Sequence, residues 1–249
     1  MLFLFNAKLP YVTKNAEPQP DYNKSEIINM IKETRVEGCV TQIAALRADM
    51  SDAAAVVTLL PAGSQVEILR DSGEIWYLVR GLNSGKPGWV RREALTITPD
   101  GPTDTTRMNK TQLEDYANIM GYNSQTRFLV VVDISRQQTH VFKGEKHKWE
   151  LIASMGVSTG KNESPTVRGD FKLTDRGLWF YSERLRSGAK YWVRFDGPYL
   201  FHSVAMDRDG NVTDGTLGRK SSNGCIRLSV PDAEWFYKNV PDKTRVVII

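Results

Sequence analysis

The most informative stretch of the chain is Ser222-Asn223-Gly224-Cys225-Ile226-Arg227, and His202 lies 23 positions before Cys225. A thiol needs a base before it attacks a carbonyl carbon, and an imidazole supplies one. A glycine next to the thiol lets the backbone approach a substrate and turn its N–H groups toward a developing oxyanion. These residues predict Cys225 as a nucleophile and His202 as its base. The alternative is a buried cysteine that acts as a small apolar side chain.

Working outward, His202-Ser203 and Ser222-x-Gly224-Cys225-Ile226-Arg227 resemble the signature of the YkuD-type L,D-transpeptidases, enzymes that cross-link peptidoglycan. Further segments resemble that family in the same order along the chain. They are Arg127 to Asp133, Gln138 to Phe142, Val157 to Lys161, Ser164-Pro165-Thr166 with Gly169 and Phe171, Asp232-Ala233, and Val246 to Ile249. The resemblance covers residues 126–249, and this range is expected to hold every atom needed for acylation.

The resemblance implies an enzyme that transfers acyl groups between peptidoglycan stem peptides through a thioester on Cys225, without a cofactor. His202 would take the thiol proton, and the carbonyl of Ser203 would orient the imidazole. The N–H groups of Gly224 and Cys225, with Asn223, would form the oxyanion hole. Ser222 is expected to form hydrogen bonds within the loop.

Arg227 and the aromatic residues are less specific candidates for the site. Arg227 either structures the loop or holds a substrate carboxylate, and a salt bridge to a nearby acid is the alternative. Four aromatic residues lie close together in the sequence: Tyr191, Trp192, Phe195 and Tyr199. Most of them are expected in the core, and Tyr191 is expected to face the cleft. His140 and His147 have no thiol or carboxylate pattern around them, so no metal is expected.

Two departures from the family pattern concern the histidine. Asn223 stands where family members commonly carry a second histidine, which leaves His202 as the single imidazole base nearby. The interval from His202 to Cys225 is also longer than usual, and the polar turn Asp207 to Asn211 accounts for the extra residues as the tip of an inserted hairpin. This turn is not expected to bind calcium, because the twelfth position from Asp207 is Gly218 and not glutamate.

Two other functions fit parts of the sequence. A papain-like cell-wall peptidase also combines cysteine with histidine, but there the cysteine typically precedes the histidine, whereas here His202 comes first. A non-catalytic wall-binding protein with a degenerate site is the second alternative, and Asn223 is the residue that favours it. The net charge of +4 comes from scattered lysines and arginines, so no nucleic-acid partner is expected.

The sequence before residue 100 predicts a separate, smaller β domain. Short β segments at 56–60, 65–70, 75–80 and 88–91 alternate with Gly- and Pro-containing turns, which is typical of a small barrel. Trp76-Tyr77-Leu78-Val79 and Gly85-Lys86-Pro87-Gly88-Trp89-Val90 resemble a bacterial SH3-like domain. The resemblance implies either a cell-wall ligand or a spacing role for this domain. Cys39, in a predicted strand, is expected in its core.

These segments predict a mainly β chain: a lead segment at 1–35, an SH3-like barrel at 36–99, a linker with a helix at 100–125, and a β-rich catalytic domain at 126–249 with a few helices. Ser25 is expected to cap a short helix, and Thr111 with Glu114 a second one. The strands of the catalytic domain are expected at 128–132, 140–142, 151–154, 178–181 and 191–195.

The expected location is outside the cytoplasm, in the cell wall or secreted, although Met1 to Phe5 is too short for a signal peptide and no apolar stretch is long enough to span a membrane.

Overall fold

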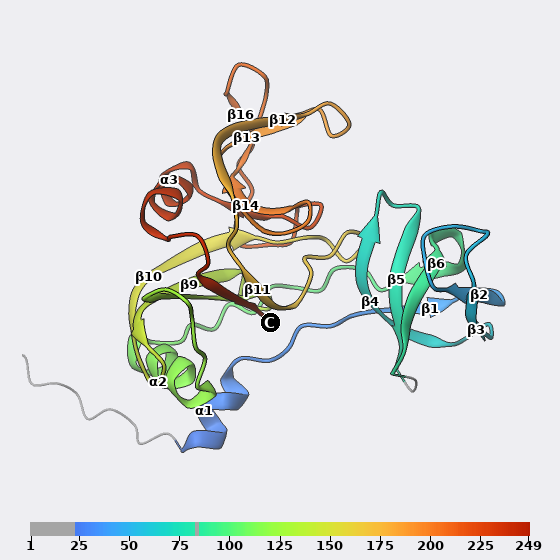
Figure 1. Ribbon diagram of the computed structural model, residues 1–249, viewed down its shortest axis with the longest axis horizontal. Coiled ribbons are helices and arrows are strands. Elements are labelled where there is room, and N and C mark those ends of the chain that lie inside the picture. The colour runs from blue at the N-terminus through green and yellow to red at the C-terminus, as the bar shows by residue number, and fades with distance from the viewer. Residues whose placement is uncertain (1–22, 83–84) are drawn as a thin grey trace, which may run out of the picture.

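The computed structural model describes residues 23–82 and 85–249, which form two β sheets, each with its own core (Figure 1). The apolar start at Met1 to Phe5 and most of the lead segment predicted at 1–35 lie outside the described residues. The prediction of a mainly β chain is confirmed.

Seven strands form the first sheet, in the order β3-β2-β6-β5-β4-β1-β7. They are β1 (Val36–Val40), β2 (Ala44–Arg47), β3 (Val56–Leu60), β4 (Gln65–Ser72), β5 (Trp76–Gly81), β6 (Pro87–Arg91) and β7 (Leu95–Ile97), with the short 3₁₀ turn η1 (Arg92–Ala94) before the last. All four strands predicted in this region are present as β3 to β6. Neighbouring strands run antiparallel, and their inward side chains include Val66, Tyr77 and Val79.

Cys39 is a correction to the sequence prediction. Its neighbours Gly38 and Val40 are buried, whereas the side chain of Cys39 is only half-buried. Successive side chains of a strand point to opposite faces, so the buried Val36 and Val40 place Cys39 on the other face.

Eleven strands form the second sheet, in the order β11-β18-β8-β9-β10-β17-β14-β13-β15-β16, with β12 paired to β13. They are β8 (Phe128–Asp133), β9 (Gln138–Glu145), β10 (Lys148–Ser158), β11 (Gly169–Lys172), β12 (Arg176–Ser182), β13 (Ser187–Asp196), β14 (Tyr199–Ser203), β15 (Ala205–Met206), β16 (Val212–Asp214), β17 (Ile226–Leu228) and β18 (Arg245–Ile248). Most pairs are antiparallel, but β14 pairs parallel with β17, and β18 pairs parallel with β8.

Strand β8 explains why the second sheet has apolar residues on both faces. Val130 and Val132 point into one core cluster, which also contains Phe201 and Phe236. Leu129 and Val131 point into another cluster on the opposite face, which two helices cover. A strand covered on both sides is expected to be continuously hydrophobic, as the run from Phe128 to Val132 is.

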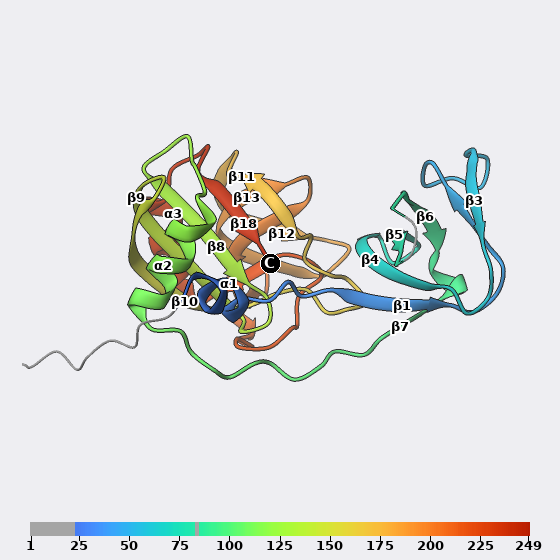
Figure 2. The same cartoon turned by 90° about the horizontal axis from the view of Figure 1, so that it is seen from below.

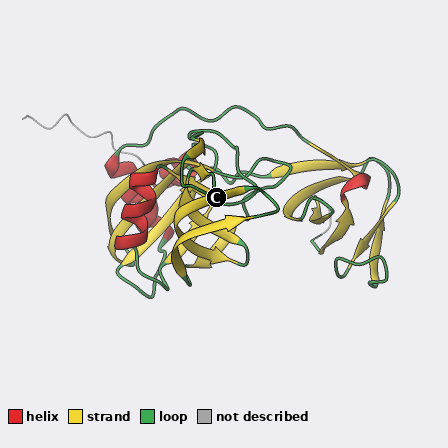
Figure 3. Cartoon of the chain, turned by 90° about the horizontal axis from the view of Figure 1, so that it is seen from above, coloured by secondary structure: helices red, strands yellow, loops and turns green. Residues whose placement is uncertain are grey.

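The helices gather at the second sheet, whereas the first has only η1 (Figure 3). Helices α1 (Lys24–Met30) and α2 (Lys110–Met120) pack together over β8 and β10, and α3 (Val230–Asn239) lies on the other face, against β13 and β14. The predicted starts of α1 and α2 are each wrong by two residues. Asn23 with Glu26, and Asn109 with Gln112, form the capping boxes, because in each case an asparagine stands ahead of the predicted cap.

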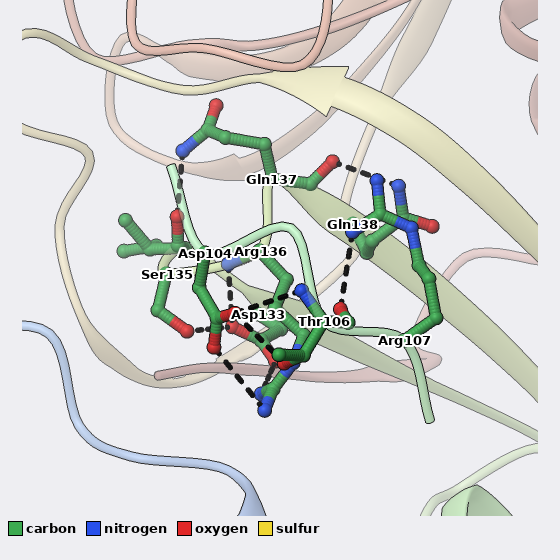
Figure 4. A network of polar contacts seen from close by, with 9 residues as sticks. Asp104, Thr106, Arg107, Asp133, Ser135, Arg136, Gln137 and Gln138 are labelled. Atoms are coloured by element: carbon green, nitrogen blue, oxygen red, sulfur yellow. Dashed lines mark hydrogen bonds and ion pairs between the residues drawn. The ribbon is translucent and has the colours of Figure 1, made fainter. Parts of the chain in front are cut away.

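The chain passes between the two sheets twice, once from α1 to β1 and once along the extended segment from β7 to α2 (Figure 2). The second crossing is fixed to the turn between β8 and β9 (Figure 4). The N–H of Asp104 donates to the carbonyl of Ser135 at 2.9 Å, and Arg136 forms ion pairs with both Asp104 and Asp133. No helix within the described residues is both long and apolar enough to cross a membrane.

Candidate active site

The parallel pairing of β14 with β17 brings the predicted nucleophile and base together. Phe201 lies opposite Ile226, and His202 lies opposite Arg227. Side chains alternate along a strand, so Phe201 and Ile226 enter the core while His202 and Arg227 take the other face. Cys225, two residues before Arg227, joins that face, and all three side chains line one cavity of about 460 Å³.

The surroundings of His202 fix its ring and its tautomer. The Nδ1 atom lies 2.6 Å from the carbonyl oxygen of Ser203, which can only accept a hydrogen bond. Nδ1 therefore carries the proton, and Nε2 keeps a lone pair that can accept another. The ring of Phe180 meets the imidazole edge to face, with 5.4 Å between the ring centroids. The hydroxyl of Ser203 accepts the backbone N–H of Lys190 at 2.9 Å and donates to the carbonyl of Val204.

Gly224 is required by two independent features of the loop. Its φ of +98° is a conformation that side-chain-bearing residues rarely adopt. A Cβ atom at this position would also lie 2.4 Å from Cε1 of Tyr199. The glycine thus allows the loop to lie directly against the Tyr199 ring, next to Cys225. The Cys225 thiol approaches the carbonyl of Pro198, with 3.8 Å between sulfur and oxygen.

The carbonyl groups of the loop are held by hydrogen bonds. The hydroxyl of Thr166 accepts the Gly160 N–H and donates to the Gly224 carbonyl, both at 2.8 Å. Ser222 donates from its side chain to the Cys225 carbonyl at 2.5 Å. Since C=O and N–H point in opposite directions across a trans peptide, the Thr166 contact also sets the direction of the Cys225 N–H. Thr166 lies in a segment with family resemblance, but no role was predicted for it.

A second support comes from the turn between β8 and β9. Gln137, which is buried and has a φ of 52°, donates to the Thr159 hydroxyl and accepts the Thr159 N–H, each at 2.8 Å. The carbonyl of Thr159 in turn accepts the N–H groups of Ser221 and Ser222. Gln137 therefore connects the turn drawn in Figure 4 with the loop that carries Cys225. Sequence reasoning missed this residue, since its polarity favoured an exposed turn.

Arg227 is engaged by an acid of the inserted hairpin. Its Nη1 lies 2.6 Å from the Asp214 carboxylate, and its Nε is buried without a hydrogen-bond partner among the described residues. Asp214 belongs to β16, on the far side of the predicted Asp207 to Asn211 turn, which does form the tip between β15 and β16. Of the alternatives weighed for Arg227, the salt bridge to a nearby acid is the one that the structure contains.

Tyr191 does not line the cavity, contrary to prediction. Its side chain shares the face of Val193 and Phe195 and packs against Tyr237 of α3, with 5.9 Å between ring centroids. Of the predicted site residues, Ser222, Asn223, Cys225, His202 and Arg227 line the cavity. Tyr199 and Phe180 line it as well.

The cavity also has a wall from the first sheet. Asp71, Ser72 and Gly73, at the turn from β4 to β5, line it together with Ser164 of the second sheet. The cavity wall thus extends beyond residues 126–249, whereas the expectation that this range holds every atom needed for acylation stays a prediction. No local motif could have shown this, because the turn reaches the cavity only through the packing of the two sheets.

Burial keeps both reacting groups uncharged. Desolvation lowers the pKa of His202 to about 4, and the positive charge of Arg227 acts in the same direction, although the hydrogen bond to Ser203 opposes it. Desolvation also raises the pKa of the Cys225 thiol to about 11. At neutral pH the resting pair is thus a thiol and a neutral imidazole, which suits proton transfer during attack and not a preformed ion pair.

The other two histidines lie elsewhere. His140 is buried in β9 with Nδ1 2.9 Å from the Ser154 hydroxyl, and His147 is exposed at the turn between β9 and β10. Across residues 23–82 and 85–249, no three His, Cys, Asp or Glu side chains are grouped so that they could hold a metal ion.

Comparisons with known proteins agree on one family. Residues 127–248 match the family model of the L,D-transpeptidase catalytic domain, YkuD. The chain is 35% identical over 164 residues to "Putative L,D-transpeptidase YciB" of Bacillus subtilis, covering 61% of this chain and 82% of that protein.

Solved structures were compared as well. A "Fused Zn-dependent amidase/peptidase/peptodoglycan-binding domain-containing protein" of Clostridium acetobutylicum is 34% identical, with a TM-score of 0.48, over 56% of this chain and 59% of that one. An L,D-transpeptidase of Mycobacterium smegmatis is 18% identical, with a TM-score of 0.42, over 74% and 82% of the two chains. The family match and the Bacillus relative establish that this chain belongs to the L,D-transpeptidase family, with its catalytic domain in residues 127–248.

Proposed function

We propose that this protein cross-links peptidoglycan stem peptides by acyl transfer through a thioester on Cys225. The observation that carries the proposal is the shared face of β14 and β17, where His202, Arg227 and Cys225 line one cavity. The family name supplies the class of bond, an amide between an L- and a D-residue.

The proton steps follow from the tautomer of His202. As the Cys225 sulfur attacks the amide carbonyl, its proton passes to Nε2 of His202, since Nδ1 already donates to Ser203. The resulting imidazolium then gives this proton to the departing amine, which leaves the acyl group on sulfur. An acceptor amine attacks the thioester, loses a proton to His202, and releases the thiolate, which takes the proton back.

The oxyanion formed at the carbonyl needs hydrogen-bond donors. The N–H groups of Gly224 and Cys225 are the candidates, because the carbonyl of Gly224 is held by Thr166 on the opposite side of the peptide. Asn223 is exposed at the rim of the cavity and can add its side-chain amide. A donor of this kind contributes about 3 kcal/mol to stabilising the transition state.

The first sheet adds a proposal of its own. Its seven antiparallel strands around one core support the SH3-like resemblance, and the proposed partner is a cell-wall peptide or glycan. Such substrates place the protein outside the cytoplasm, in the wall or secreted.

An acylation experiment tests the enzymatic proposal. We expect imipenem to add once to the full-length protein in an intact-mass measurement, and Cys225→Ala to abolish the adduct. His202→Ala should slow acylation by about a hundred- to ten-thousand-fold, because general-base help is lost. His147→Ala serves as the matched control, with a rate within about threefold of the parent, as His147 lies outside the cavity.

The outcomes separate this proposal from its alternatives. A folded protein that forms no adduct would favour a non-catalytic wall-binding protein. An adduct that forms equally fast in His202→Ala would remove His202 from the mechanism. Cleavage of stem peptides without any amide product would favour a papain-like peptidase.

A further inference from the structure

The cavity around Cys225 is enclosed by two turns from different sheets. One is Asp71-Ser72-Gly73, at the turn from β4 to β5, and the other is the turn between β12 and β13, with Arg184 and Leu185. The first of these turns belongs to the sheet that has no catalytic residue. Its contribution to the cavity has no part in the acylation steps described above.

The Asp71 turn is held firmly against the catalytic loop. Arg70 forms an ion pair with Asp196, and its guanidinium lies over the ring of Tyr199, 5.3 Å from the centroid. The ring of Tyr199 in turn packs directly against Gly224 of the catalytic loop. Opposite Asp71 on β5, Tyr77 donates from its hydroxyl to the Glu163 carbonyl at 2.5 Å. These contacts fix the position of Asp71 relative to Cys225.

Asp71 is attracted by Arg184 of the same cavity but is not paired with it. Its carboxylate accepts the backbone N–H of Glu74 at 3.2 Å, and it forms no ion pair among the described residues. Burial raises the pKa of this carboxyl group, and the Ser164 hydroxyl and the positive charge of Arg184 oppose the rise. Arg227, a cation in the same cavity, already pairs with Asp214. A half-buried carboxylate of this kind is stabilised by a cationic group that enters the cavity.

The proposed reaction brings such a group to this cavity. The thioester on Cys225 must be resolved by an amine, and amines that form peptide cross-links are largely protonated at neutral pH. We propose that Asp71 binds the ammonium group of the incoming acceptor amine, so that the first sheet contributes the acceptor subsite. This inference rests on the proposed function. Asp71 raises the local concentration of the amine, which loses one proton to water before it attacks and the next to His202 as it attacks.

The test compares two nucleophiles that differ in charge. Glycinamide is largely cationic at neutral pH, whereas hydroxylamine is uncharged. Full-length protein is acylated by a donor peptide with an L,D amide bond, and the ratio of amine adduct to hydrolysis product is measured against nucleophile concentration. We expect Asp71→Asn, which keeps the size of the side chain, to raise the half-saturating glycinamide concentration about tenfold. Hydroxylamine should remain within about twofold of the parent, because it has no charge for Asp71 to bind.

Two further variants separate charge from shape. Asp71→Glu should restore glycinamide use to within about threefold of the parent, because it keeps the carboxylate. Glu74→Gln, an exposed acid on the same turn, should change nothing. The control Glu74→Gln should also react with imipenem at the parental rate.

Two results would overturn the inference. They are an unchanged glycinamide response in Asp71→Asn and an equal loss with hydroxylamine. Each of these leaves the proposed function intact if the parent is acylated on Cys225. A parent that is never acylated overturns both.

Discussion

At the scale of single residues, burial of His202 works against the charge that the reaction requires. Its pKa is lowered to about 4, yet the imidazole must become imidazolium during each transfer. The charge is therefore favourable only while a thiolate or oxyanion is present beside it. His140 is also buried and its pKa is lowered to about 4, by desolvation, although it has no place in the reaction. Both residues resist protonation in the folded protein and accept it after unfolding.

This difference predicts acid sensitivity. Between the ordinary histidine pKa of 6.5 and the folded value of about 4, the unfolded chain binds protons that the folded chain does not. Stability should therefore fall as the pH falls through this window, by about 1–3 kcal/mol for each histidine. Urea unfolding of His140→Gln at pH 7, 6, 5 and 4 should show a shallower decline than the parent. His147→Gln should keep the parental decline, and the same slope in all three proteins would contradict the prediction.

At the scale of elements, the catalytic loop is positioned by segments far from it in sequence. Gln137 and Thr159 hold Ser221 and Ser222, while Thr166 connects Gly160 with Gly224. Both supports are buried, and both act through backbone groups of the loop. The position of the loop that carries Cys225 thus depends on side chains of the turn between β8 and β9 and of the segment that follows β10.

Removing one hydroxyl tests this dependence. Thr166→Val keeps the shape of the side chain but leaves the Gly160 N–H and the Gly224 carbonyl without their partner. We expect acylation by imipenem to slow by about tenfold or more, since a misdirected oxyanion donor loses a few kcal/mol. Thr166→Ser keeps the hydroxyl and should stay within about threefold. A lower melting temperature with an unchanged acylation rate would show that Thr166 supports the fold alone.

The sequence predicted roughly half of the strands and fewer of the contacts between them. Several strands and the two main site residues could be recognised, because local pattern and motif carry that information. The capping residues Asn23 and Asn109 were missed in favour of nearby threonine or serine. Tyr191 was misplaced, since its face depends on the register of β13. Asp71 and Gln137 reach the site only through tertiary packing, which no local pattern contains.

At the scale of the whole molecule, the two sheets are connected by hydrogen bonds and ion pairs around the segment at 160–168. Asn162 donates from its side chain to the carbonyls of Thr98 and Pro99 and from its backbone to Asp100. The carboxylate of Glu163 accepts hydrogen bonds from Nε and Nη2 of Arg92. These contacts connect the first sheet, which contributes a wall of the cavity, to the second sheet, which carries Cys225 and His202. We therefore expect the two sheets to unfold together.

Calorimetry can test this cooperation. The parent should show a single unfolding transition. Asn162→Ala removes two side-chain hydrogen bonds between the sheets, each contributing about 0.5–1.5 kcal/mol, and should separate the transition into two. Asn211→Ala, whose side chain bonds only to Asp207 within its own turn, is the matched control and should keep one transition. Two transitions in the parent would contradict the prediction.

The pairing of β18 with β8 has a consequence for synthesis on the ribosome. Val246, near the end of the chain, lies beside Val130 in parallel register, and Val247 packs in the same cluster as Ile27 of α1. The first sheet closes among residues 36–97 and can form while the rest is still being translated. The second sheet must wait for its last strand, which stands between β8 and β11. A nascent chain that lacks β18 would thus present a finished first sheet beside an open, aggregation-prone second one.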